Sequence, residues 1–146
     1  MYEEKKLELL KLFNETAPIA KFFGMRLSFD SQGQATLDLP YNSNLDHALG
    51  GIHGGIYATM LDNAGWFASA LTHEKSCWVA TSEMSFHLFA AAKQTNLRAV
   101  GKVIKSGKRQ DVCEMRLYEA NDQLIAHATG TFIILPSIPL NKQKSV

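Results

Sequence analysis

One carboxylate and two pairs of glycines mark residues 50–64 (GGIHGGIYATMLDNA) as the part of the chain most suited to chemistry. Asp62 is the only acidic or basic residue between Gly54 and Leu71. A carboxylate on such an apolar stretch is costly to bury unless it is paired or has a chemical role. Asp62 is therefore a candidate reactive group, and an ion pair with a distant Lys or Arg is the alternative.

The glycines predict a helix that begins near Gly54. Gly-Gly pairs at 50–51 and 54–55 permit a tight turn and a close approach of the backbone. The first N–H groups of a helix have no acceptor inside the helix, so they can hold an oxyanion or polarise a carbonyl. The stretch thus offers a carbonyl-polarising end and a carboxylate, unless the glycines only punctuate a loop.

Helical spacing surrounds Asp62 with small residues. The positions three, four and seven residues away are Gly55, Ala58, Thr59, Gly65, Trp66 and Ser69. Except for Trp66, these side chains leave room for a ligand or a close neighbour. Because residues 54–71 are apolar on almost every side, we expect a long, buried helix there.

Shorter elements must surround this helix. Leucines and Phe13 recur among Glu and Lys over residues 3–13, which predicts an amphipathic helix limited by Pro18. Strands are predicted on both sides of a Ser-Gln-Gly turn, at residues 25–29 and 34–39. Four more strands, joined by short turns that favour antiparallel pairing, are predicted at residues 77–89, 97–105, 111–119 and 124–135.

Two finer expectations concern the last four strands. In the strand at 77–89, alternation predicts one shared face for Trp78, Ala80, Met84, Phe86 and Leu88. Pro136 and Pro139 are expected to end the ordered structure, leaving residues 137–146 as a disordered tail.

These elements predict an α+β fold in which a curved antiparallel sheet wraps around one long central helix. The length of 146 residues suits a single domain over residues 1–146, with residues 1–22 as an N-terminal helical region. A single sheet leaves two edges and one face uncovered, and pairing of sheets in a dimer answers both needs.

The composition excludes several classes of partner. A formal net charge of +1 argues against nucleic acid or an anionic membrane as the main partner. No apolar run has the length of a membrane span, and the charged N-terminus lacks the apolar segment of a secretory signal. Cys77 and Cys113 have no metal or redox spacing and indicate core residues in a reducing compartment. We expect a cytoplasmic protein.

The sequence resembles the hotdog-fold acyl-CoA thioesterases, specifically the phenylacetate-pathway-type (PaaI-like) subfamily. The resemblance covers nearly the whole chain, and its motifs are Phe23-Gly24-Met25, Leu37-Asp38-Leu39-Pro40, Gly51-Ile52-His53-Gly54-Gly55 and Ala128–Phe132. The His-Gly-Gly pattern is fairly specific because an acid, Asp62, follows nine residues after His53 and an alternating strand comes next.

This resemblance implies the hydrolysis of an acyl-CoA thioester to a carboxylic acid and coenzyme A, with no metal or other cofactor. The backbone N–H of Gly54 would polarise the carbonyl, and Asp62 would act as general base or as nucleophile. The active site would lie across the interface of a homodimer or homotetramer. Asp62 would then serve a substrate held mainly by the other protomer.

One position departs from the subfamily, which usually has Asn six residues before the His of the motif. Here that position is His47, whose neutral imidazole can donate one hydrogen bond in place of the amide. Asn44 in the same loop is a second candidate, and a solvent-exposed loop histidine is the alternative for His47. His53 is expected to bond within the helix-entry loop and to aim the N–H of Gly54.

The resemblance suggests further site residues. Thr81 would lie near the attacking water and come from the partner subunit. Lys108 and Arg109 resemble a turn that contacts the phosphates of coenzyme A, while Gly55 and Trp66 would contact the substrate. The alternatives are an ordinary strand threonine and a solvated hairpin tip.

Other functions fit parts of the pattern. A non-catalytic acyl-CoA sensor would not need both Asp62 and the donor of Gly54. A hotdog hydratase or dehydratase would pair a catalytic His with its acid in another local pattern, which is not found here. A zinc site of His47, His53 and Asp62 has the right atoms but no familiar spacing. The remaining histidines, expected at the surface or on strand faces, are His73, His87 and His127.

Overall fold

The computed structural model describes residues 2–141. A helical region comes first, with helix α1 (Tyr2–Lys11), the π-helical turn η1 (Leu12–Thr16) and helix α2 (Pro18–Phe23). Strands β1 (Arg26–Phe29) and β2 (Ala35–Leu39) lead through the short 3₁₀ helix η2 (Ser43–Leu45) into the long helix α3 (Gly54–Thr72). Four strands follow: β3 (Cys77–Leu88), β4 (Leu97–Ser106), β5 (Gln110–Glu119) and β6 (Leu124–Pro139).

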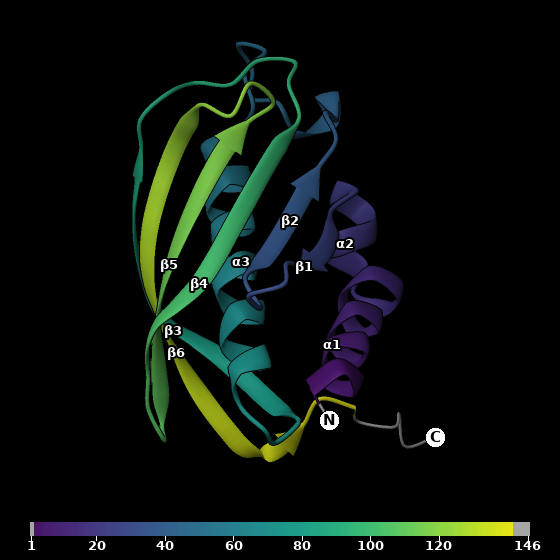
Figure 1. The fold of residues 1–146 in the computed structure, drawn as a ribbon. Coiled ribbons are helices and arrows are strands. Elements are labelled where there is room, and N and C mark those ends of the chain that lie inside the picture. The colour runs from purple at the N-terminus through teal and green to yellow at the C-terminus, as the bar shows by residue number, and fades with distance from the viewer. Residues whose placement is uncertain (1, 142–146) are drawn as a thin grey trace.

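All six strands form one antiparallel sheet in the order β1-β2-β4-β5-β6-β3. The sheet curves around α3, and α1 lies on the other side of that helix from β5 and β6 (Figure 1). The predicted α+β architecture, a curved sheet around one long helix, is confirmed. Within residues 2–141, no helix has the length and hydrophobicity needed to cross a bilayer.

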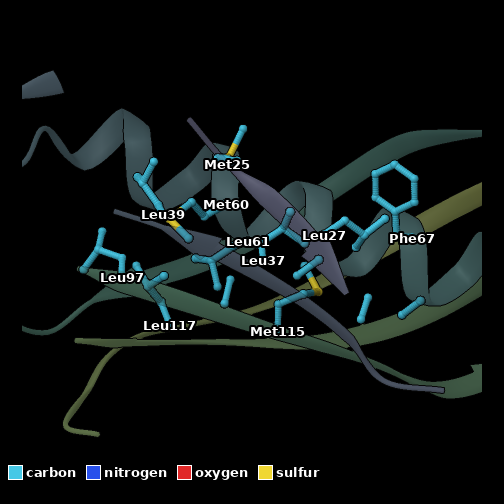
Figure 2. Packing of buried hydrophobic residues seen from close by; sticks show 14 of the residues in the cluster. Met25, Leu27, Leu37, Leu39, Met60, Leu61, Phe67, Leu97, Met115 and Leu117 are labelled. Atoms are coloured by element: carbon cyan, nitrogen blue, oxygen red, sulfur yellow. The ribbon is translucent and has the colours of Figure 1, made fainter. Parts of the chain in front are cut away.

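The core lies between α3 and the concave face of the sheet. Met60 and Leu61 of α3 are fully buried and lie among Leu37, Met115 and Leu117 of the sheet (Figure 2). Burying such side chains stabilises the fold by roughly 1.5–3 kcal/mol each. The helix is therefore held by its apolar surface, as its composition predicts.

A glycine on β4, Gly101, lets the backbone of α3 pack directly against the backbone of the sheet. A Cβ atom on Gly101 would lie 2.2 Å from the carbonyl oxygen of Ala64 and 2.9 Å from the backbone nitrogen of Gly65. Both neighbours are backbone atoms of α3, so no side-chain rotation relieves the overlap. Gly101 thereby fixes how deep the helix lies in the sheet.

A β-bulge changes the phase of β3. Thr81 pairs with Phe132 and Glu83 pairs with Thr131, so Ser82 is an extra residue. An extra residue exchanges the two faces of a strand beyond it. The prediction that Trp78 and Ala80 share a face with Met84, Phe86 and Leu88 is therefore wrong. Val79 is 1% exposed and Trp78 is 39% exposed, which shows that the odd-numbered residues point inward before the bulge.

The prediction that order ends at Pro136 is wrong for residues 137–141. Strand β6 continues to Pro139, Leu140 is buried, and the Asn141 amide donates to Glu8 at 2.6 Å. The last residue of β6 that pairs with β5 is Ile133. Beyond it, β6 pairs only with β3, so backbone N–H donors are needed on that side alone. Prolines are tolerated in such a place. The rest of the predicted tail, residues 142–146, lies outside the described residues.

Gly101→Ala should lower the free energy of unfolding by about 1–3 kcal/mol or more, because the new methyl group forces α3 away from β4. Urea denaturation followed by circular dichroism measures this loss. Lys105→Ala, on an exposed position of the same strand, is the control and should stay within about 0.5 kcal/mol of the wild type. Equal midpoints for the wild type and Gly101→Ala would contradict the account of this contact.

Candidate active site

Asp62 is half-buried near the middle of α3 and has no cationic partner among residues 2–141. The hydroxyl of Thr81 donates a hydrogen bond of 2.6 Å to its Oδ1. In the part of the chain that the structure describes, no Lys or Arg forms an ion pair with it. The carboxylate is therefore oriented by a neutral donor and is not neutralised.

This contact lies within one chain, so Asp62 and Thr81 belong to the same half of the predicted site. The bulge at Ser82 explains the arrangement. It leaves Thr81 on the same face as Val79, the face turned toward α3. Sequence alternation without the bulge placed Thr81 on the opposite face from Met84.

An apolar cavity of about 360 Å³ adjoins Asp62. Its walls come from η1, the start of α2, the middle of α3 and the start of β3. Its lining residues are Leu12, Phe13, Thr16, Ala17, Pro18, Ile19, Asp62, Asn63, Trp66, Phe67 and Trp78. The ring of Trp66 is held there because its Nε1–H donates to the carbonyl of Val79 at 2.6 Å. Asp62 is thus the one ionisable group on a wall that is otherwise mainly hydrophobic.

The start of α3 is held by His53, the N-cap residue. Its Nδ1 accepts the N–H of Gly55 at 2.8 Å, and its own N–H donates to Leu45 at 3.1 Å. The expected bond within the helix-entry loop is present. It also occupies the donor of Gly55, whereas no acceptor for the N–H of Gly54 occurs within residues 2–141.

Gly54 and Asp62 are too far apart in one chain to act on the same carbonyl. They are eight residues apart on one helix, which corresponds to about 12 Å along its axis. A reacting atom must lie about 3 Å from both its donor and its attacking group. A single chain therefore presents two separate halves of the predicted machinery.

The other predicted site residues do not contact Asp62 in the described chain. His47 is exposed, and its Nδ1 accepts the N–H of Leu49 at 3.1 Å. Asn44 is exposed in η2. Lys108 and Arg109 are exposed in the turn between β4 and β5, near the far end of α3 from Gly54 (Figure 1).

The zinc alternative has no geometric support in the described chain. No group of three His, Cys, Asp or Glu side chains among residues 2–141 is arranged to hold a metal ion. His47 uses its Nδ1 on Leu49, and His53 uses its Nδ1 on Gly55.

Sequence reasoning missed a buried polar cluster around Asp111 of β5. This residue is 0% exposed, and its carboxylate accepts from Ser69 at 2.6 Å, contacts Nε2 of His73 at 2.7 Å and accepts from the Gly107 N–H at 3.3 Å. The side chain of His73, expected at the surface, is 21% exposed, and its ring bonds to this carboxylate. Ser69 lies in the last turn of α3 and His73 is its C-cap residue, so their spacing of four residues was the available signal.

The Asp111 cluster ties the end of α3 to the β4–β5 turn, and Lys5 holds the same end from α1. The ammonium of Lys5 donates to the carbonyls of His73 and Lys75. Cations near the C-terminus of a helix stabilise it. Burial lowers the pKa of Lys5. Ser69 donates to Asp111 and not to His73, so the cluster lacks the Ser–His pair of a catalytic triad.

Comparison with known proteins identifies the family of this chain. A model of the thioesterase superfamily matches residues 49–126, more than half of the chain. The chain belongs to the thioesterase superfamily. The match begins in the loop before α3 and includes His53, Gly54, Asp62 and Thr81.

Solved structures of other proteins show the same fold. The E. coli PaaI protein from the phenylacetic acid degradation operon has a TM-score of 0.84 at 16% identity, over 94% of this chain and 99% of that one. A thioesterase family protein from Silicibacter pomeroyi has a TM-score of 0.83 at 24% identity, over 94% and 100%. These likenesses confirm the predicted hotdog fold.

A protein that is similar to this chain in sequence is named as an esterase. A protein of Saccharolobus solfataricus named "Putative esterase" is 27% identical over 125 residues, which cover 86% of this chain and 89% of that protein. Together with membership of the thioesterase superfamily, this similarity supports hydrolase activity on thioesters in general terms.

His53→Ala should lower the free energy of unfolding by about 1 kcal/mol, because the N–H of Gly55 loses its acceptor. His53→Asn should retain most of that stability, since an Asn side chain is a good N-cap. Thermal and urea denaturation of the two variants measure the difference. An equal loss in both would show that the ring packing, and not the capping bond, is what His53 contributes.

Proposed function

We propose that this thioesterase superfamily member hydrolyses an acyl-CoA thioester to a carboxylic acid and coenzyme A, without a cofactor. The observation that carries the proposal is the environment of Asp62. Its carboxylate is oriented by Thr81, lacks a cationic partner in the described chain and borders an apolar cavity. An uncompensated carboxylate beside a hydrophobic cavity is unfavourable for folding, so a chemical role accounts for it.

In the proposed reaction, Asp62 acts on the thioester carbonyl in one of two ways. As a general base, it takes a proton from water while the water oxygen attacks the carbonyl carbon. As a nucleophile, it attacks that carbon itself, and water then hydrolyses the mixed anhydride. In both cases the C–S bond breaks and coenzyme A leaves as the thiolate. Because Thr81 holds Oδ1, the second carboxylate oxygen is directed toward water or substrate.

The proposed oxyanion donor is the N–H of Gly54. It lies at the positive end of the α3 dipole and is free of acceptors among the described residues. His53 supports it by fixing the helix start. One such donor contributes about 10²–10³ to the turnover rate.

We propose that the complete site forms between two copies of the chain. The distance of about 12 Å along α3 means that the donor of Gly54 must act with Asp62 of the partner subunit. Strand β3, which carries Thr81, is an edge of the sheet and so has unpaired backbone groups. Near its end, Phe86, Leu88 and Phe89 are 41%, 43% and 57% exposed. Pairing of β3 with a second copy covers these groups and brings the two halves together.

Four polar residues are proposed to hold the rest of the substrate. His47 and Asn44 are exposed in the loop before α3, where the ring of His47 has a second nitrogen free to donate. Lys108 and Arg109 are exposed, and their cations suit the phosphates of coenzyme A.

Asp62→Asn should lower kcat for acyl-CoA hydrolysis by about 10²–10⁴ and leave the fold intact, since an amide cannot accept the proton. Release of coenzyme A is measured with a chromogenic thiol reagent. The protein adds little background because Cys77 and Cys113 are buried and burial raises the pKa of Cys113 to about 12. Asp38→Asn makes the same change at an exposed carboxylate of β2 outside the cavity and is the matched control. Wild-type kcat in Asp62→Asn would refute the proposed role of Asp62.

Gly54→Pro removes the proposed oxyanion donor without a change of helix geometry. Gly54 is the first residue of α3, and proline is favoured at that position. His53 precedes it with φ −63° and ψ 136°, a conformation that proline accepts in its neighbour. We expect kcat to fall by about 10²–10³. Gly54→Ala keeps the N–H, and its Cβ meets only the flexible tip of Leu88 at 3.1 Å, so it should stay active. Equal activity of both variants would exclude the donor.

Mixing the two inactive variants tests the shared site. A hybrid dimer of Gly54→Pro and Asp62→Asn subunits has one site with both defects and one with neither. Random mixing should therefore restore roughly a quarter of wild-type activity after subunit exchange. If each site lies within one chain, the hybrids stay inactive.

A further inference from the structure

Given the thioester hydrolysis proposed above, we propose that the cavity beside Asp62 binds the acyl group and that η1 of the same chain sets its length. The expected substrates carry an uncharged, medium-length or aromatic acyl group. The acyl pocket thus comes from the chain that supplies the carboxylate, and the oxyanion donor comes from its partner subunit.

The position of the cavity follows from the position of the reacting carbon. That carbon must lie close to Asp62 or to a water bound by it. The acyl group starts at the same carbon and therefore starts beside Asp62. The apolar cavity opens directly from this carboxylate. An alkyl or aryl group leaves water by entering it, which favours binding in proportion to the apolar area buried.

A chain of aromatic rings forms one wall of the cavity. The ring of Phe13 meets Phe67 at 5.1 Å, Phe67 meets Trp66 at 4.7 Å, and Trp66 meets Trp78 at 5.0 Å, all edge to face. None of the described residues that line the cavity is a cation able to pair with an anionic acyl group. Any charged acyl group would lose its hydration there, and an anionic one would also be repelled by Asp62. The wall therefore selects uncharged apolar groups.

The N-terminal segment supplies Phe13 and the rest of the lining, and Asn14 holds this segment in place. The Asn14 side chain donates to the carbonyl of Leu27 at 3.0 Å and accepts the N–H of Leu27 at 2.8 Å. These two bonds imitate a neighbouring strand at the free edge of β1. They fix η1, whose residues Leu12, Phe13 and Thr16 face the cavity. π-Helical turns are rare in proteins, and those that occur are often found at functional sites.

The size of the cavity limits the acyl length. At roughly 30 Å³ for a water-sized group, about 360 Å³ holds on the order of ten carbon atoms. An acetyl group leaves most of this space empty, whereas an octanoyl or phenylacetyl group fills much of it. Longer chains must leave part of their length in solvent.

The first experiment is a hydrolysis series with the full-length wild-type protein on acetyl-, butyryl-, hexanoyl-, octanoyl-, dodecanoyl- and palmitoyl-CoA. We expect kcat/KM to rise about fourfold per methylene group at first. It should then level off near ten carbon atoms. A flat profile, or preference for acetyl-CoA, would overturn the proposal.

A pair of neighbouring substitutions tests which wall sets the length. Thr16→Phe fills the cavity from η1. Glu15→Phe adds the same ring next to it, on the side of η1 that lines another hollow with Arg26 and Ser28. Thr16→Phe should lower kcat/KM for octanoyl-CoA at least tenfold more than it lowers kcat/KM for acetyl-CoA. Glu15→Phe should change neither. Parallel profiles for Thr16→Phe and the wild type would overturn the proposal.

Asn14 is proposed as a positioning residue, and its variants have a readout of their own. Asn14→Asp keeps the acceptor for the N–H of Leu27 and loses the donor, while Asn14→Ala loses both. We expect KM for octanoyl-CoA to rise in the order wild type, Asp, Ala, with kcat for acetyl-CoA unchanged. A fall in kcat alone, equal for all acyl lengths, would show that Asn14 acts on stability and not on the pocket.

Binding of thioethers separates this proposal from the proposed activity. S-ethyl and S-octyl coenzyme A cannot be hydrolysed, and calorimetry measures their Kd. We expect S-octyl coenzyme A to bind at least tenfold more tightly, and Thr16→Phe to remove the difference. That result without hydrolysis of any acyl-CoA would keep the pocket and refute the activity. Hydrolysis with equal Kd values for both thioethers would refute the pocket and keep the activity.

Discussion

The contact between α3 and β4 at Gly101 is the constraint on which the rest of the structure depends. Because Gly101 has no side chain, the helix lies at main-chain distance from the sheet. Met60 and Leu61 of the helix are then fully buried between the helix and the sheet. A helix packed this closely cannot rotate or slide without opening voids or overlaps. The direction of every side chain on α3 is thereby fixed, and Asp62 faces Thr81 and the N-terminal segment.

Both ends of this helix are held by side chains, and that leaves one donor free. His53 caps the start through Gly55, and Lys5 binds the carbonyls at the other end. Asp111 adds a buried anchor to the same end. The helix therefore does not need the N–H of Gly54 for its own stability. A group that the fold does not use is available to a substrate at little cost in folding free energy.

Helix geometry also explains why one chain is an incomplete catalyst in the proposed function. A rigid helix keeps its first residue and Asp62 more than two turns apart. The donor and the carboxylate can therefore meet on one carbonyl only if a second helix supplies the missing half. The edge strand β3 offers the surface for that association, and it also carries Thr81. The same strand, β3, thus carries the edge proposed for dimer pairing and the threonine that orients Asp62.

Local patterns in the sequence were sufficient to predict the types of the elements, the central apolar helix, the unusual carboxylate Asp62 and the loop bond of His53, because each depends on neighbours in the chain. The phase of β3, the strand after Pro136, the bond between Thr81 and Asp62 and the cluster around Asp111 depend on contacts between distant segments. A bulge of one residue, or a strand end that pairs with one neighbour only, leaves no periodic pattern in the sequence. Only the tertiary structure therefore decided these features. The apolar cavity is of the same kind, since its walls come from residues that the sequence keeps far apart.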